Sequence, residues 1–103
     1  MMLHICSDKN NSSLTNVQKV DVQPNAVDLR VDKIYAIEEK TFIIDEDRKV
    51  HRGSTEIFPD AEGYWELEVG TYEIVMENII TVGEGEAGWV ITRSTLNRNG
   101  CLS

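Results

Sequence analysis

The chain has 103 residues, so we treat residues 1–103 as a single domain. Its 18 acidic and 10 basic residues give a formal net charge of −8, which would repel phosphate backbones and argues against a nucleic-acid partner. No apolar stretch is long enough to cross a bilayer, so no membrane partner is expected. Cys6 and Cys101 fit neither a zinc site nor a disulfide framework, which favours reduced thiols and a cytoplasmic protein.

The first half of the chain combines polar loops with extended segments. Residues 3–5 predict a short first strand, and the polar residues 8–16 predict a loop. Residues 27–31 alternate Val and Leu with Asp and Arg, a pattern typical of a half-buried strand. Residues 34–36 and 41–44 continue the β character. We therefore expect strands, and no helix, in this part of the chain.

The second half of the chain is also predicted to consist of short strands and turns. Turns are predicted at residues 45–49, 59–63 and 83–86. Strands are predicted at residues 64–69, 72–76, 79–82 and 88–92. Helical periodicity is confined to residues 94–99. Short strands with a turn about every 8–12 residues are typical of an all-β sandwich or barrel.

The aromatic and imidazole side chains give weaker signals. Trp65 and Trp89 lie in predicted strands and are expected to be core or interface residues. His4 and His51 have no cluster of other ligands around them in the sequence, so we interpret them as surface or structural residues.

The most distinctive segment, residues 92–100, reads TRSTLNRNG. A predicted strand ends here and a short turn or helix begins, with Ser94 or Thr95 as its candidate cap. The Arg93 fork, the two hydroxyls and free backbone N–H groups suit a polyphosphate. Arg98 lies five positions after Arg93, so the two would not share a face of an ideal helix. The alternative is a capped surface turn whose arginines pair with carboxylates.

A second segment, residues 25–30, reads NAVDLR and carries Asp28. In the predicted strand Asp28 lies on the polar side, where its carboxylate could hold an arginine, a ribose hydroxyl or a metal-bound water. The alternative is an exposed carboxylate on a strand with no further role.

Taken in order, the two segments resemble motifs of the dCTP deaminase and dUTPase superfamily. Residues 25–30 resemble its first motif, in which a small residue and Val or Tyr precede Asp-Leu or Asp-Val and Arg. Residues 92–100 resemble its Gly-Arg-Ser-Ser-Leu-Ala-Arg-x-Gly motif, and residues 70–82 resemble the strand between them. The resemblance covers residues 20–103, and its order and spacing are closer to the deaminase branch than to typical dUTPases.

The resemblance implies a distorted jelly-roll or β-clip fold that assembles as a homotrimer or larger assembly, with sites between subunits. By the motif match, Arg93, Ser94 and Thr95 would contact the phosphates of a deoxynucleoside triphosphate, with Mg²⁺ bridging these phosphates. Ser94 and Arg98 would assist catalysis. Asp28 would be structural or would organise the metal and its water. The deaminases of this family use no zinc, and no metal bound by the protein alone is expected.

Two features depart from the family pattern. Thr92 replaces the usual Gly before Arg93, and the sequence ends at Ser103, three residues after the second motif. The expected fold is therefore incomplete at its C-terminus, and the region that carries the catalytic carboxylate is absent. We expect a nucleotide-binding protein with impaired or no activity as this chain. The alternative is a non-catalytic trimeric structural or interaction module, such as a viral particle decoration protein in the virion or host cytoplasm.

Overall fold

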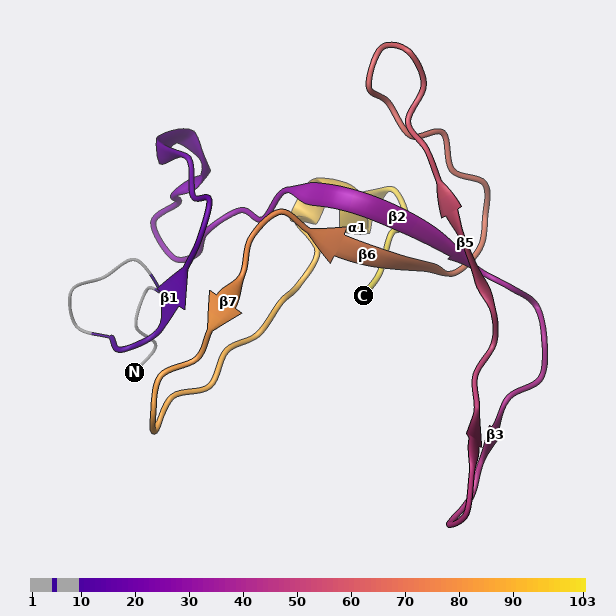
Figure 1. The fold of residues 1–103 in the computed structure, drawn as a ribbon. Coiled ribbons are helices and arrows are strands. Elements are labelled where there is room, and N and C mark those ends of the chain that lie inside the picture. Colours follow the sequence, from indigo (N-terminus) through magenta and orange to yellow (C-terminus); the bar gives the residue numbers. More distant parts are fainter. Residues whose placement is uncertain (1–4, 6–9) are drawn as a thin grey trace.

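The computed structural model describes residue 5 and residues 10–103 (Figure 1). Within these residues, strands and turns predominate, joined by a 3-10 helix at Lys19–Asp21 (η1) and an α-helix at Ser94–Arg98 (α1). The predicted all-β, dUTPase-like fold class is confirmed. Cys6, His4 and most of the strand predicted at residues 3–5 lie outside the described residues. No helix in the described part of the chain has the length and apolar character needed to span a membrane.

The central sheet holds the buried core of the described chain. It consists of three antiparallel strands in the order β5-β2-β6, with the bounds Ser54–Ile57 (β5), Val31–Ile37 (β2) and Tyr72–Met76 (β6). In the middle strand, Ile34 lies opposite Ile57 on one side and Ile74 on the other. Ile34 is 5% exposed, because both neighbouring strands cover it. The register of the sheet therefore places three isoleucines side by side across its strands.

Two smaller sheets flank the central one. They pair Ser13–Leu14 (β1) with Ile80–Thr81 (β7), and Ile43–Ile44 (β3) with Lys49–Val50 (β4). The predicted turn between β3 and β4 is confirmed. The Asp45 Oδ1 atom accepts the backbone N–H of Asp47 at 2.9 Å and that of Arg48 at 2.7 Å. An aspartate that bonds its own backbone in this way is a common means of closing a turn.

Three predicted strands differ in the structure. Residues 64–69 and 88–92 form no strand, and the strand predicted at residues 27–31 begins only at Val31. Alternating apolar residues favour an extended chain, but a strand also needs a hydrogen-bonded neighbour. Near residue 27 the chain folds back on itself, with an isolated bridge between Val22 and Val27 in place of a ladder.

The chain leaves much of its apolar surface exposed. Its accessible surface is 9109 Å², against roughly 5,900 Å² for a compact monomer of this size. Its radius of gyration is 16.7 Å, against about 13 Å for a compact domain. Exposed hydrophobic side chains include Phe58, Val69, Trp89, Ile91 and Leu102. Trp89 is 92% exposed, so in the chain alone it is not a core residue.

A buried polar cluster joins the segments that the sheets leave separate. Asn78 is 8% exposed, and its Oδ1 atom accepts the backbone N–H of Arg30 at 3.0 Å. Its Nδ2 atom donates to the carbonyl oxygens of Thr15 at 2.8 Å and Asn16 at 3.3 Å. The Thr15 hydroxyl accepts the N–H of Ile79 at 2.8 Å. Because burial makes unpaired polar groups costly, these bonds fix the N-terminal segment to the chain between β6 and β7.

Replacing Asn78 is expected to destabilise the fold. The change Asn78→Ala leaves the N–H of Arg30 and two carbonyl groups without their partner, which should lower the free energy of unfolding by about 2–3 kcal/mol. Urea unfolding at one fixed protein concentration measures this loss. The matched control is Asn99→Ala, which removes an exposed bond to the Thr95 carbonyl and should cost less than about 1 kcal/mol. Equal losses in the two variants would contradict the structural role of Asn78.

Candidate functional site

Arg93 stands at the start of α1, just before the first helical turn. Its backbone is extended (φ −64°, ψ 154°), and its carbonyl accepts the N–H of Asn97 at 3.0 Å. Arg93 is therefore the N-cap, and no side chain caps the helix, so the predicted cap by Ser94 or Thr95 is wrong. The Thr92 hydroxyl donates to the side-chain oxygen of Asn97. The hydroxyls of Ser94 and Thr95 do not cap the helix.

A glycine ends α1 after little more than one turn. Gly100 has a φ of +84°, a left-handed conformation that other residues adopt only with strain. Its N–H donates to the Asn97 carbonyl at 3.1 Å, and the N–H of Cys101 donates to the Leu96 carbonyl at 2.9 Å. These two bonds form a Schellman motif, which satisfies the last carbonyls of the helix. The sequence Asn-Gly at this point thus explains why the helix is short.

The structure brings the two sequence motifs together through Arg93 and Asp28. The Arg93 Nη1 atom lies 3.5 Å from the Asp28 Oδ2 atom, although the two residues belong to distant parts of the chain. In Figure 1, α1 lies behind the central sheet, near the end where β2 begins. The Arg93 side chain is 69% exposed and that of Asp28 is 24% exposed. An ion pair this exposed contributes about 0–1 kcal/mol, so it does little for stability.

The other predicted site residues lie on α1. Ser94 and Thr95 are exposed on its first turn, directly after Arg93. Arg98 is exposed at its last turn, and no carboxylate in residues 10–103 forms an ion pair with it. The helix is regular, so the irregular backbone that would let Arg98 converge on Arg93 is not observed.

A bidentate ion pair closes the loop that carries Asp28. The Arg30 Nε atom donates to Asp21 Oδ2 at 2.7 Å, and its Nη2 atom donates to Asp21 Oδ1 at 3.0 Å. Asp21 is 7% exposed, and its backbone carbonyl accepts the N–H of Asp28 at 2.8 Å. The hydrogen bond from Arg30 holds the pKa of Asp21 below its ordinary value, and the same bond raises the pKa of Arg30.

The structure adds two residues, Asp21 and Asn78, that were not predicted from the sequence. The one signal in the sequence that points to them is Arg30, a charged residue two positions after Asp28 for which no partner was predicted. Asp21 is nine positions before Arg30 and Asn78 is 48 positions after it, so neither contact follows from the alternation of neighbouring residues.

The carboxylate at this site could bind a metal ion only together with oxygen atoms of a bound ligand. In the part of the chain that the structure describes, no three His, Cys, Asp or Glu side chains gather closely enough to hold a metal ion. Asp28 is the carboxylate beside Arg93, and Gln23 Nε2 lies 3.5 Å from its Oδ2 atom. Mg²⁺ is commonly held by one or two carboxylates together with substrate phosphates. Asp28 therefore fits a Mg²⁺ ion that is carried by a polyphosphate.

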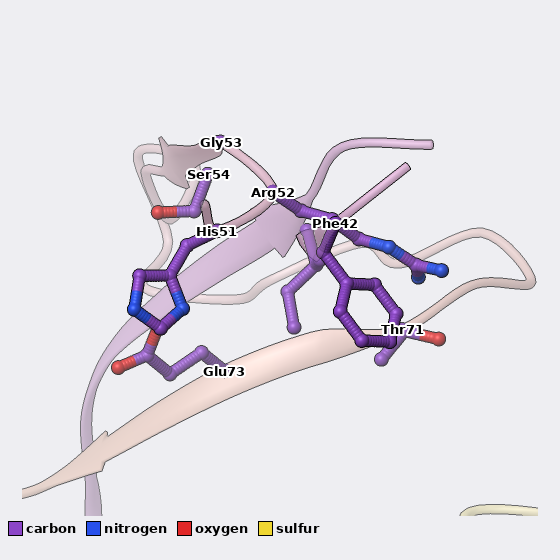
Figure 2. A pocket seen from close by; sticks show the side chains of 8 residues that line it. Phe42, His51, Arg52, Gly53, Ser54, Thr71 and Glu73 are labelled. Carbon is purple, nitrogen blue, oxygen red and sulfur yellow. The ribbon is translucent and has the colours of Figure 1, made fainter. Parts of the chain in front are cut away.

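Two hollows lie on other parts of the surface. One, of about 520 Å³, lies at the base of the β3–β4 hairpin, where Figure 2 shows Phe42 and His51 pointing toward the strand that carries Glu73. Arg52 stacks there on Phe42, 5.0 Å from the ring centroid. The other hollow, of about 410 Å³, is lined by residues 16–18 and by Glu77. Neither hollow includes Arg93, Asp28 or another predicted site residue.

The chain is similar to curated proteins of one class. A probable deoxyuridine 5′-triphosphate nucleotidohydrolase of Aeropyrum pernix is 31% identical over 80 residues, which cover 78% of this chain and 49% of that protein. Proteins of the same name from two strains of Halobacterium salinarum are 34% identical over 86 residues, covering 79% of this chain and 52% of theirs. These similarities support the dUTPase superfamily that the two motifs indicate.

The similarity has definite bounds. The chain spans about half the length of the curated relatives it matches. No family model matches it, and no solved structure gives a significant match.

The Asp21–Arg30 pair should make stability depend on acid pH. Because the pKa of folded Asp21 is lowered from 3.8, the folded chain binds fewer protons there than the unfolded chain. The pair therefore stabilises the fold above about pH 4, and this contribution is lost as the pH falls through the lowered pKa. Urea unfolding of the wild type and Asp21→Asn at decreasing pH measures the effect.

We expect the difference in unfolding free energy between the two proteins to be largest at neutral pH and to shrink below about pH 4. The matched control is Asp45→Asn, which alters the exposed pair with Arg48 and should change little at any pH. A difference for Asp21→Asn that does not change with pH would contradict the assignment.

Proposed function

We propose that this chain binds a deoxynucleoside triphosphate through Arg93, Ser94 and Thr95, as a protein of pyrimidine nucleotide metabolism. The observation that carries the proposal is the 3.5 Å approach of Arg93 to Asp28, which unites two motifs from distant parts of the sequence at one place. The printed names of the relatives, which specify deoxyuridine triphosphate, support the same class of ligand.

The chemistry of this arrangement suits a triphosphate. A guanidinium offers a planar fork of N–H donors that matches phosphate oxygens, and the neighbouring hydroxyls of Ser94 and Thr95 add neutral donors. Asp28 lies 3.5 Å from Nη1, one of the two terminal nitrogens of the fork, and this contact orients Arg93 before the ligand arrives. A Mg²⁺ ion bound to the phosphates would neutralise part of their charge. Asp28 is the residue placed to receive such an ion, because a bare carboxylate would otherwise repel the phosphates.

The base and the reaction form a finer part of the proposal. The motif order favours the deaminase branch and therefore dCTP, whereas the names of the relatives favour dUTP, so both ligands belong in the test. We propose impaired or no turnover by these 103 residues. Asp28 is the one carboxylate that the described residues place against Arg93, and the proposal assigns it to Arg93 and to the phosphate-bound Mg²⁺, which leaves no second carboxylate there to activate water. Catalytic assistance by Ser94 and Arg98 stays a prediction, and Arg98 lies at the far end of α1 from Arg93.

Calorimetric titration with dUTP, dCTP and dTTP in the presence of Mg²⁺ tests the binding proposal. We expect the wild type to bind dUTP or dCTP. We expect Arg93→Gln to lower the affinity by about tenfold or more, because a charged donor to phosphate is removed. The matched control is Arg48→Gln, which changes another exposed arginine in an ion pair of 3.5 Å. Absence of heat for every nucleotide with the wild type would overturn the proposal, as would equal effects of the two variants.

The exposed apolar surface supports a second proposal, that copies of this chain assemble. The accessible surface exceeds that of a compact monomer by roughly 3,200 Å², which is within the range that a stable interface buries. Trp89 and Ile91 lie in an extended segment with no strand partner among the described residues. The homotrimer of the resembled superfamily is the assembly we propose, in the cytoplasm or, for a viral protein, in the virion. Such an assembly would also suit the alternative function, a structural module without nucleotide chemistry.

Sedimentation equilibrium tests the assembly. We expect a mass of three chains, and we expect dilution to shift Trp89 fluorescence to longer wavelength as a covered indole becomes wet. The variant Trp65→Phe leaves Trp89 as the sole tryptophan for this measurement. A stable trimer that binds no nucleotide would favour the structural module, and a monomer at every concentration would rule out the assembly.

A further inference from the structure

We propose that Asp21 and Arg30 are positioning residues, which hold Asp28 against Arg93 without touching the ligand themselves. The inference rests on the proposed function, because it assigns to the Arg93–Asp28 pair the residues that keep it in place. Neither Asp21 nor Asn78, which anchors Arg30, belongs to the motifs that the sequence analysis identified.

The Asp21 carboxylate is bonded to Arg30 through both of its oxygens. Both of its oxygens accept hydrogen bonds from Arg30, at 2.7 and 3.0 Å, and the residue is 7% exposed. A planar guanidinium matched to a planar carboxylate fixes both angle and distance, which a single bond to a lysine would not do. Asp21 is thus not available to bind a ligand or a metal, and any effect it has on binding must pass through other residues.

Asp21 also fixes the backbone of Asp28. The Asp21 carbonyl accepts the Asp28 N–H at 2.8 Å, so one residue holds Arg30 by its side chain and Asp28 by its main chain. The loop between them is drawn closed by the bridge between Val22 and Val27. The backbone of Asp28 is consequently held in one place within the loop, which sets where its carboxylate meets Arg93.

Arg30 is itself fixed to the rest of the fold. Its N–H donates to Asn78 Oδ1 at 3.0 Å, and its carbonyl accepts the N–H of Glu77 at 2.8 Å. Asn78 is buried and is bonded in turn to the Thr15 carbonyl. The segments that carry Thr15 and Asn78 are therefore bonded to the loop that carries the Asp28 carboxylate.

Burial separates the two ends of this network. Asp21 and Asn78 are nearly closed to solvent, whereas the Asp28 and Arg93 side chains are 24% and 69% exposed. The exposed pair would be mobile if it depended on its own attraction, since such pairs contribute about 0–1 kcal/mol. The fork has two hydrogen bonds, an Asp21 side chain that is 10% exposed and an Arg30 side chain that is 42% exposed. It supplies the order that a single contact of 3.5 Å lacks, which is the arrangement expected where a functional group must be held in one geometry.

A double-mutant cycle on Asp21 and Asp28 tests the proposal. The probe is the affinity for the nucleotide that the wild type binds, dUTP or dCTP, measured with Mg²⁺ by calorimetry. We expect Asp21→Asn to weaken binding roughly tenfold in the wild-type background, and less than about twofold in the Asp28→Asn background, because its effect passes through Asp28. Hydrogen exchange at the Asp28 amide should accelerate in Asp21→Asn, a change that requires no ligand.

Two further variants make the result specific. Arg30→Lys keeps the charge but loses the fork, so we expect intermediate affinity and intermediate exchange, and this variant serves if Asp21→Asn does not fold. Asp45→Asn makes the same chemical change in an exposed pair and should alter neither reading.

The outcomes separate the two proposals. Equal weakening by Asp21→Asn in both backgrounds, or unchanged exchange at Asp28, would overturn the positioning role while leaving nucleotide binding intact. A wild type that binds none of the nucleotides would overturn the proposed function, and the positioning role with it.

Discussion

The fork between Arg30 and Asp21 is the interaction on which the described site depends. The first strand of the central sheet, β2, begins only at Val31, after this loop, so the ladder of that sheet does not include Asp28. The fork and the Asp21 carbonyl take the place of that ladder, and Asn78 ties the fork to the chain between β6 and β7. A bond network of this kind can order a loop because each buried polar group would be costly if left unpaired.

A second constraint acts on the whole chain. With Ile34 as the buried hydrophobic residue of the described part, the central sheet alone provides little of the apolar burial that stabilises a domain of this size. The polar cluster at Asn78 fixes where segments lie, but hydrogen bonds make a modest net contribution to stability. The exposed apolar side chains of Trp89 and Ile91 are therefore the surface on which the proposed assembly of copies would draw for further burial.

The sequence predicted some elements of the fold well and others wrongly, for one reason. Strand β6 and the turn at Asp45 were predicted, since alternation and an aspartate that bonds its own backbone act within a few residues. The short helix α1 was also indicated, and the Asn-Gly that ends it is a local signal. Residues 64–69 and 88–92 alternate equally well yet form no strand, because pairing needs a neighbour that the pattern itself does not provide.

The same division applies to the candidate site. The residue types of Arg93 and Ser94 suit a phosphate ligand but fit a capped surface turn as well. The order of the two motifs, through the family that they resemble, is what favoured the phosphate ligand. The tertiary structure decided which of them meet: Arg93 reaches Asp28, and Arg98 does not share the contact. It also revealed Asp21, which is buried and bonded to Arg30 across one loop, and Asn78, which is buried and bonded to a distant segment. Local sequence determines what a side chain can do, and long-range packing determines which partner it finds.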